Sequence, residues 1–138
     1  MDSMTTILAD HNVEGQFGVL ARIWTSPDWL DLWLSLVGGT ETFASLGLAS
    51  DLADSELWSL CQERDMVLIT GNRNADDDDS LEVTMRKLCQ PNSLPVLTIA
   101  DPNRVMYDRE YAERVAVQII DILMDLDRVR GTRRIYVP

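Results

Sequence analysis

Short apolar runs alternate with amphipathic stretches along the whole chain, which is the pattern of successive strand and helix units. The clearest buried strand is predicted at residues 66–70, where an apolar run lies between the turn-forming residues Asp65 and Gly71. Other strands are predicted at residues 5–9, 40–44, 94–100 and 135–137, of which 40–44 has the weakest pattern.

Helices are predicted wherever apolar residues recur at intervals of three and four. These segments are residues 13–24, 28–37, 54–63, 80–88 and 108–130. Gly38-Gly39 is expected to end the second helix and Gly131 the last one, and Asp101-Pro102-Asn103 is expected to form a turn. We therefore predict a three-layer α/β/α fold with a mostly parallel central sheet, and residues 1–138 as a single domain.

Composition adds little to this fold class but narrows the possible partners. Hydrophobic residues make up 46% of the chain and charged residues 25%, as in ordinary globular proteins. The formal net charge of −11 repels nucleic acid at long range, so non-specific DNA coating is not expected. A metal ion in an acidic pocket would invert the charge locally, so a phosphodiester substrate stays compatible with this charge.

Cysteine usage and the N-terminal sequence indicate a reducing compartment. Cys61 and Cys89 match no metal-binding spacing and are expected to be reduced, buried thiols. No signal sequence or apolar run of membrane-spanning length is visible, and a cytoplasmic location is expected. Trp29, Trp33 and Trp58 lie on helical patterns with leucine neighbours, so we expect core or interface positions for them rather than a base-stacking platform.

Acidic and amide side chains cluster where predicted strands end or helices begin. Asp10 directly follows the first strand, and Asp51 and Asp54 precede the helix at 54–63. After the strand at 66–70 come Asn72, Asn74 and the run Asp76, Asp77, Asp78 and Asp79. Ligands bind at the carboxyl ends of parallel strands, and hard divalent cations prefer oxygen ligands. These positions therefore predict a Mg²⁺ or Mn²⁺ site at that edge of the sheet.

Each of these carboxylates also has a purely structural interpretation. Asp10 can be a turn former, and Asp54 or Asp51 can cap the helix that follows. Asp79 and Glu82 have the spacing of a capping box. The run from Asp76 to Asp78 can be a solvated loop, although a cation would relieve the repulsion between its crowded carboxylates.

Other polar residues near these positions are open to two interpretations. His11 follows Asp10 and could act as a general base, but neighbouring strand residues point to opposite faces, so we expect it to be satisfied elsewhere. Asn12 and Asn74 could orient a water or a phosphate, or could simply form turns. The hydroxyl of Thr70 could reach the same edge as Asp10.

These motifs resemble those of the PIN-like domains, in a compact group placed with toxin-like nucleases. The segment Leu8-Ala9-Asp10-His11-Asn12 is similar to the family's first strand, which ends in Asp with a nearby Asn. Gly47-Leu48 followed by Asp54-Ser55-Glu56-Leu57 looks like the family's second motif, a helix start. The segment 67–74 is similar to the family's strand that ends in Thr-x-Asp-x-Asp. By motif the resemblance covers about residues 5–75.

The resemblance implies a Mg²⁺- or Mn²⁺-dependent ribonuclease in which metal-activated water hydrolyses RNA. Asp10 and Asp54 would be metal ligands, whereas Asn72 and Asn74 stand where the family usually has aspartates. Amide oxygens bring no charge, so a carboxylate of the following run, such as Asp77 or Asp79, would have to complete the ligand set. Asp10, Asp54 and Asn72 are then the expected catalytic residues. The resemblance also implies an antitoxin partner, and the Trp-rich helices suggest a homodimer.

Two other functions compete with this interpretation. The first is a catalytically degenerate PIN-like or flavodoxin-like module whose acidic surface binds a protein, which the replacements at Asn72 and Asn74 favour. The second is a receiver domain that accepts phosphate on an aspartate. A receiver needs a phosphoacceptor after its third strand and a lysine after its fifth, and Lys87 is the only lysine in this chain.

Overall fold

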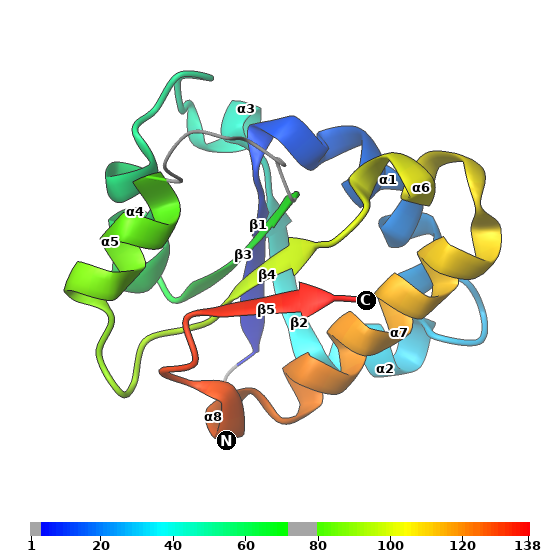
Figure 1. Cartoon of the computed structure of the whole chain (residues 1–138). Coiled ribbons are helices and arrows are strands. Elements are labelled where there is room, and N and C mark those ends of the chain that lie inside the picture. The colour runs from blue at the N-terminus through cyan, green and yellow to red at the C-terminus, as the bar shows by residue number, and fades with distance from the viewer. Residues whose placement is uncertain (1–3, 72–79) are drawn as a thin grey trace.

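The computed structural model, which describes residues 4–71 and 80–138, contains a five-stranded sheet with helices on both faces (Figure 1). All strand pairs are parallel, and the order across the sheet is β2-β1-β3-β4-β5. The strands are β1 (Thr5–Ala9), β2 (Val37–Glu41), β3 (Met66–Gly71), β4 (Val96–Ile99) and β5 (Arg134–Val137). The predicted three-layer α/β/α class is thus confirmed, with a sheet that is entirely parallel.

The first face of the sheet is covered by α1 (Glu14–Trp24), α2 (Leu30–Leu36), α6 (Pro102–Tyr107) and α7 (Arg109–Met124) (Figure 1). Alternate strand residues point to this side because the side-chain period of a strand is two. The first buried hydrophobic cluster lies on this face. It joins Ile7, Ala9, Val67, Ile69, Leu97 and Ile99 to Leu20 and Trp24 of α1 and to Val115 and Ile119 of α7.

The opposite face is covered by α4 (Asp54–Glu63) and α5 (Ser80–Leu88). Its buried cluster joins Leu8, Leu68 and Val96 to Leu57 and Cys61 of α4 and to Leu81 and Met85 of α5. The three inner strands β1, β3 and β4 are therefore covered on both faces, which explains their continuous apolar sequences.

The segment between α2 and α4 differs from its prediction. A strand was expected at 40–44 and a helix stop at Gly38-Gly39, but β2 begins at Val37 and includes both glycines. Phe43 to Leu46 instead form the short helix α3 (Phe43–Leu46), in which Thr42 and Ser45 make a capping box. Glycine has a low strand propensity, and pairing with β1 outweighs it here, so β2 could not be located from local sequence.

The C-terminal segment also differs in detail. Asp101 is not part of an isolated turn: its side chain accepts a hydrogen bond from the Arg104 N–H and caps α6, with Pro102 in the first turn. The single helix expected at 108–130 is divided at Asp125 into α7 and α8 (Leu126–Val129). Gly131 follows with a φ of +83°, as expected for a helix-ending glycine.

Three of the four tryptophans lie in the core. The rings of Trp24 and Trp33 stack with centroids 4.4 Å apart, and Trp24 Nε1 donates to the Ala116 carbonyl at 3.0 Å. Trp33 and Trp58 are buried, and Trp29 is half-buried against the first cluster. A core or interface position was expected for these residues, and Trp33 and Trp58 lie in the core. Neither of these two rings is therefore available for a homodimer surface.

Both cysteines are free thiols, as predicted, although only Cys61 is buried and Cys89 is half-buried. Within residues 4–71 and 80–138, no helix combines the length and the apolar character that crossing a bilayer requires.

Candidate functional site

Asp10 lies immediately after the carboxyl end of β1, as its sequence position predicted. Its backbone N–H donates to the Ile69 carbonyl at 2.9 Å, which continues the β1–β3 ladder, and its carbonyl accepts from the Val13 N–H at 3.0 Å. The short helix η1 (His11–Val13) then turns the chain away from the sheet. Asp10 is only 4% exposed, so its carboxylate is held at the mouth of the sheet and is not a solvated turn residue.

The Asp10 carboxylate is bonded to the neighbouring strand. Thr70 Oγ1 donates a hydrogen bond of 2.8 Å to Asp10 Oδ2, and both side chains are buried. This confirms that the Thr70 hydroxyl reaches the same edge. A buried carboxylate needs such partners because an uncompensated charge in the protein interior is strongly unfavourable.

The strand order places Asp10 at the switch point of the sheet. The chain leaves β1 for β2 on one side and returns to β3 on the other, so the connections diverge between β1 and β3. In open α/β sheets this divergence opens a crevice outside the carboxyl ends of the strands, and ligands bind there. Asp10 and Thr70 flank that point.

Asp10 belongs to a row of polar residues that crosses four adjacent strands. The pairing of Ala9 with Ile69 places Asp10 beside Thr70, and Thr70 pairs with Thr98, which pairs with Tyr136. By alternation the row continues the face covered by α4 and α5. Thr98 Oγ1 is fully buried and has no hydrogen-bond partner among the residues that the structure describes.

Thr98 is a residue that the sequence analysis missed. The available signal was a hydroxyl residue inside the apolar strand Val96–Ile99, level with Thr70 on the adjacent strand. A buried hydroxyl without a partner is unfavourable by about 1–3 kcal/mol. Such groups deserve a functional explanation, since native structures contain few of them.

The Cys61 thiol lies near Asp10 and is uncharged at neutral pH. Burial raises the pKa of the Cys61 thiol to about 12, and the negative charge of Asp10 adds to this effect. Only a thiolate is a strong metal ligand or nucleophile, and at neutral pH this thiol keeps its proton. Cys61 is therefore a neutral neighbour of Asp10 at this pH.

Asp54 lies at the amino end of α4, and this end of the helix is near the carboxyl edge of the sheet. The helix ends at Glu63, shortly before β3 begins at Met66, so it runs antiparallel to the strands. Ala53 occupies the cap position and Asp54 is the first helical residue, so the capping interpretation of Asp54 is wrong. Asp51 lies in an exposed turn and does not cap this helix either.

The rest of the predicted ligand set lies outside the described residues. This applies to Asn72, Asn74 and the run Asp76, Asp77, Asp78 and Asp79, and therefore also to the capping box of Asp79 with Glu82. Within the described ranges, no three His, Cys, Asp or Glu side chains come together in a group that could hold a metal ion. Of the candidate site, the structure thus describes Asp10, its hydrogen-bond partner Thr70, and Asp54 at the start of α4.

His11 is an exposed residue that lies beside Glu14 and Phe43. Its Nδ1 lies 3.6 Å from Glu14 Oε1, and its ring centroid is 5.8 Å from that of Phe43. The side chain is 54% exposed, whereas Asp10 is buried. Asn12 is also exposed. Neither residue adds a buried donor to the site.

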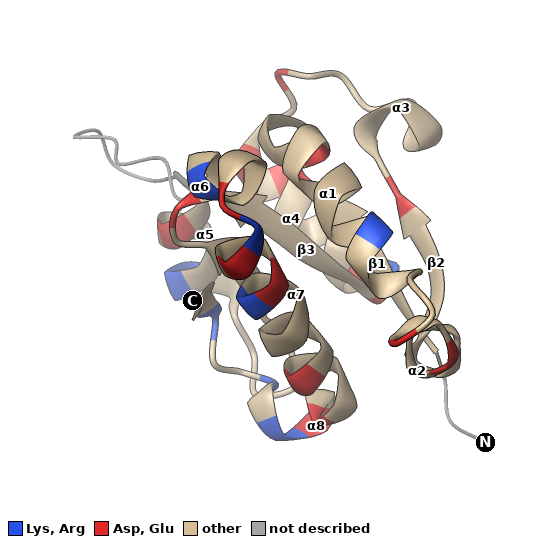
Figure 2. Cartoon of the chain, turned by 90° about the vertical axis from the view of Figure 1, so that its right-hand side faces the viewer, with Lys and Arg blue, Asp and Glu red and all other residues tan. Residues whose placement is uncertain are grey.

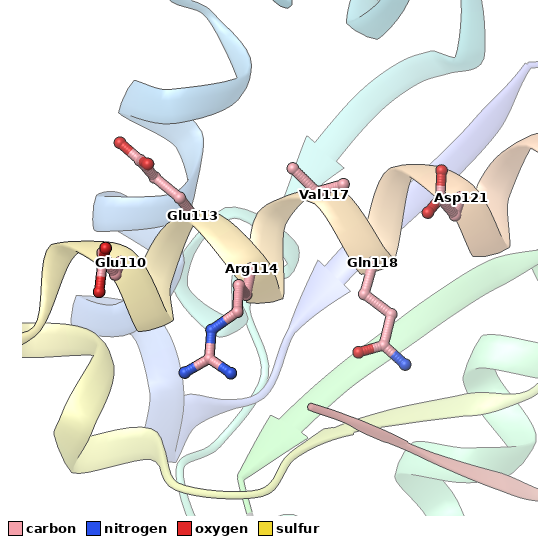
Figure 3. Close-up of a pocket in the computed structure, with 6 residues that line it drawn as sticks. All are labelled: Glu110, Glu113, Arg114, Val117, Gln118 and Asp121. Carbon is pink, nitrogen blue, oxygen red and sulfur yellow. The ribbon is translucent and has the colours of Figure 1, made fainter.

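Two sizeable cavities lie away from Asp10. One, of about 500 Å³, runs along α7 and is lined by the six residues shown in Figure 3: Glu110, Glu113, Arg114, Val117, Gln118 and Asp121. All six come from one helix, and their side chains spread along it without converging on a point (Figure 3). Another, of about 740 Å³, is lined by Thr5, Leu94 and other residues that precede the strands, so it lies at the opposite edge of the sheet. Neither cavity includes a predicted site residue.

Comparison of the chain with protein-family models, with curated proteins and with solved structures gave no match.

Proposed function

We propose that this protein is a Mg²⁺- or Mn²⁺-dependent ribonuclease of the PIN-like type, with Asp10 as the central residue of its active site. The observation that supports this most directly is the buried Asp10 carboxylate, bonded to Thr70 at the switch point between β1 and β3. A carboxylate is retained in such a buried position only when its environment compensates the charge, and a bound cation is one such compensation.

The donor atoms of the described residues are of the type that binds a hard divalent cation. Asp10 and Asp54 supply carboxylate oxygens, while burial raises the pKa of the nearby Cys61 thiol and His11 is exposed beside Glu14. Oxygen donors without thiolate or imidazole favour Mg²⁺ or Mn²⁺ over Zn²⁺. We assign the remaining ligand positions to Asn72 and Asn74 and to a carboxylate such as Asp77 or Asp79.

In this proposal the residues have separate roles. Asp10 is the main ligand, and Thr70 fixes its orientation through the 2.8 Å hydrogen bond. Asp54 adds a second carboxylate from the amino end of α4, and Asn72 positions the substrate or water. A divalent cation bound there supplies Lewis-acid polarisation of the phosphodiester and activation of water.

RNA cleavage tests this proposal. The wild type, Asp10→Asn and the control Asp51→Asn are incubated with a labelled single-stranded RNA and Mn²⁺. Asp51 is exposed and outside the assigned set, so its variant is expected to cleave like the wild type. Asp10→Asn keeps an oxygen acceptor for Thr70 but loses the charge, and its cleavage rate is expected to fall at least about 100-fold. Equal cleavage by all three proteins would reject the assignment.

A second candidate is a PIN-like module without catalysis, whose acidic surface binds a protein partner such as an antitoxin. The replacement of two expected aspartates by Asn72 and Asn74 favours it, because both changes remove charge from the ligand set. Calorimetry with Mn²⁺ separates the two candidates, since only the nuclease requires saturable binding. We also propose that the protein is cytoplasmic and forms a homodimer. Light scattering of the purified protein tests the homodimer.

A further inference from the structure

We propose that the outer surface of β5 is a binding site for single-stranded nucleic acid, with Tyr136 as the base-stacking residue and Arg133 and Arg86 as phosphate contacts. We refer to these three residues together with Arg134 as the β5 surface. The inference rests on the proposed function and extends it, because it assigns the place where the RNA is held outside the cleavage centre.

The β5 surface contains a cavity of about 370 Å³. It is lined by Glu82 of α5 and by Thr132, Arg133, Arg134 and Tyr136. Tyr136 is 53% exposed. The guanidinium of Arg134 lies 5.9 Å from the centre of the Tyr136 ring, within cation–π range. The ring is thus supported by a cation and remains accessible to a base.

Arg134 itself is a supporting residue. Its Nε lies 3.3 Å from Glu82 Oε2, and its side chain is only 10% exposed. The ion pair fixes the guanidinium beside the ring and ties β5 to α5. Proteins that bind single strands combine such aromatic platforms with nearby cations, and stacking tolerates any base.

Arg133 is directed to the same cavity by an unusual backbone conformation. In a regular strand, Arg133 would point to the opposite face from Thr132 and Arg134. Its φ is +70°, a left-handed conformation that disfavours an L-residue with a side chain, and Arg133 lines the cavity with its neighbours. The Arg133 carbonyl keeps its ladder bond to the Val96 N–H at 2.7 Å. The strained conformation therefore places an extra cation at the cavity without breaking the sheet.

The charge of this region is opposite to that of the whole protein. Figure 2 shows blue segments on α5 and on the chain that leads to the C-terminus, and the Arg134–Glu82 pair joins these two elements. Arg86 is four residues after Glu82 and so lies on the same side of α5. Arg133 and Arg86 are exposed, and neither has an ion-pair partner in the part of the chain that the structure describes. In a chain of net charge −11, these arginines are positioned to contact phosphates.

The register connects the β5 surface to the candidate active site. Tyr136 is the fourth member of the row formed by Asp10, Thr70 and Thr98, and it projects to the same face of the sheet. Three strand spacings separate the two ends of the row, a distance of about 14 Å. This separation is within the length of a short oligonucleotide, and Tyr136 is the exposed end of the row whereas Asp10 is its buried end.

Binding without cleavage tests this inference. The probe is a fluorescent ten-nucleotide oligouridine, and its anisotropy is measured with the full chain carrying Asp10→Asn, in EDTA, at several salt concentrations. Adding Tyr136→Ala is expected to weaken binding roughly 5- to 100-fold, the range of losing one stacked base. Adding Arg133→Ala is expected to reduce the slope of log K against log salt by about 0.7, the loss of one phosphate contact.

Tyr107→Ala and Arg22→Ala are the matched controls, because both residues are exposed and lie on the helices that cover the other face. Neither control is expected to change binding more than about 2-fold. Unchanged binding in Tyr136→Ala, an equal loss in the controls, or tighter binding of a duplex of the same length would each overturn the inference.

The two proposals fail separately in these experiments. Binding that depends on Tyr136, together with equal RNA cleavage by the wild type and Asp10→Asn, would keep the β5 surface and reject the cleavage centre. Cleavage that depends on Asp10, together with RNA binding that is unchanged in the Tyr136 and Arg133 variants, would keep the cleavage centre and reject the β5 surface.

Discussion

The Thr70 hydroxyl donates a 2.8 Å hydrogen bond to the Asp10 carboxylate, joining the carboxyl ends of β3 and β1 where the connections of the sheet diverge. Both residues are buried, so this bond both satisfies the hydroxyl and fixes the charge. It is the strongest link between the fold and the proposed chemistry, and its removal has separate consequences for stability and activity.

Thr70→Val is expected to lower the free energy of unfolding by about 1–3 kcal/mol. The substitution keeps the shape of the side chain but leaves a buried carboxylate with one hydrogen bond fewer. Urea denaturation measures the change. In a double-mutant cycle with Asp10→Asn, we expect a coupling energy of at least about 1 kcal/mol, and strictly additive effects would show that the bond contributes nothing.

Thr98→Val is expected to have the opposite effect on stability. Because Thr98 Oγ1 is buried without a partner among the described residues, replacing it by a methyl group relieves an unfavourable term, and stability should rise by about 1 kcal/mol. The same urea experiment compares it with Thr70→Val, since the two residues are register partners. A loss of stability in Thr98→Val similar to that in Thr70→Val would mean that the hydroxyl is bonded in solution.

Gly71→Ala is expected to destabilise the carboxyl edge of β3. An added Cβ would lie 2.8 Å from Val13 Cγ1 and 3.2 Å from Pro102 Cγ, so two packed side chains would have to move. Overpacking of this kind costs about 1–3 kcal/mol. Gly39→Ala in β2 is the control, because its Cβ would meet nothing within 4 Å and its stability should stay within about 0.5 kcal/mol of the wild type. Equal melting temperatures for the two variants would contradict this packing.

Cys61 is expected to make stability depend on pH in the alkaline range. Its pKa is raised from an ordinary value of 9.0 to about 12 in the folded state. Between these values the unfolded chain loses the thiol proton and the folded chain keeps it, so unfolding becomes more favourable as pH rises. The contribution is complete below pH 9 and declines toward pH 12, by on the order of 1 kcal/mol per pH unit.

Cys61→Ala isolates this contribution, since other groups also titrate in that range. The difference in slope between wild type and variant, measured by urea denaturation from pH 8 to 10.5, should be clear above pH 9 and absent below it. In the native protein, iodoacetamide at pH 8 should modify the half-buried Cys89 and leave Cys61 unmodified. Modification of Cys61 at an equal rate would contradict its burial.

The central elements of the fold follow from local sequence, and the departures have identifiable causes. The strands at 5–9 and 66–70 and the helices at 54–63 and 80–88 were predicted well, because apolar period and flanking turn residues agree there. Strand β2 was misplaced because it forms through pairing with β1 despite Gly38 and Gly39. Asp125 divides the last helix although the apolar spacing continues through Leu126 and Val129.

The candidate site was only partly predictable for a different reason. Asp10 and Thr70 were found because each ends a recognisable strand, but their hydrogen bond depends on a register between segments 60 residues apart. Thr98 and the β5 surface depend on two further registers, β3 with β4 and β4 with β5. Such registers arise from packing across the whole sheet, so local patterns do not contain them.

A crystal soaked in Mn²⁺ provides the decisive test of a metal site at Asp10, because the anomalous signal locates the ion without requiring the right RNA. We expect a peak within about 2.5 Å of an Asp10 carboxylate oxygen, on the side of Asp54, and its loss in Asp10→Asn crystals. An Mn²⁺ peak found only elsewhere, or none at a concentration that saturates Mg²⁺-type sites, would contradict a metal-dependent active site at Asp10.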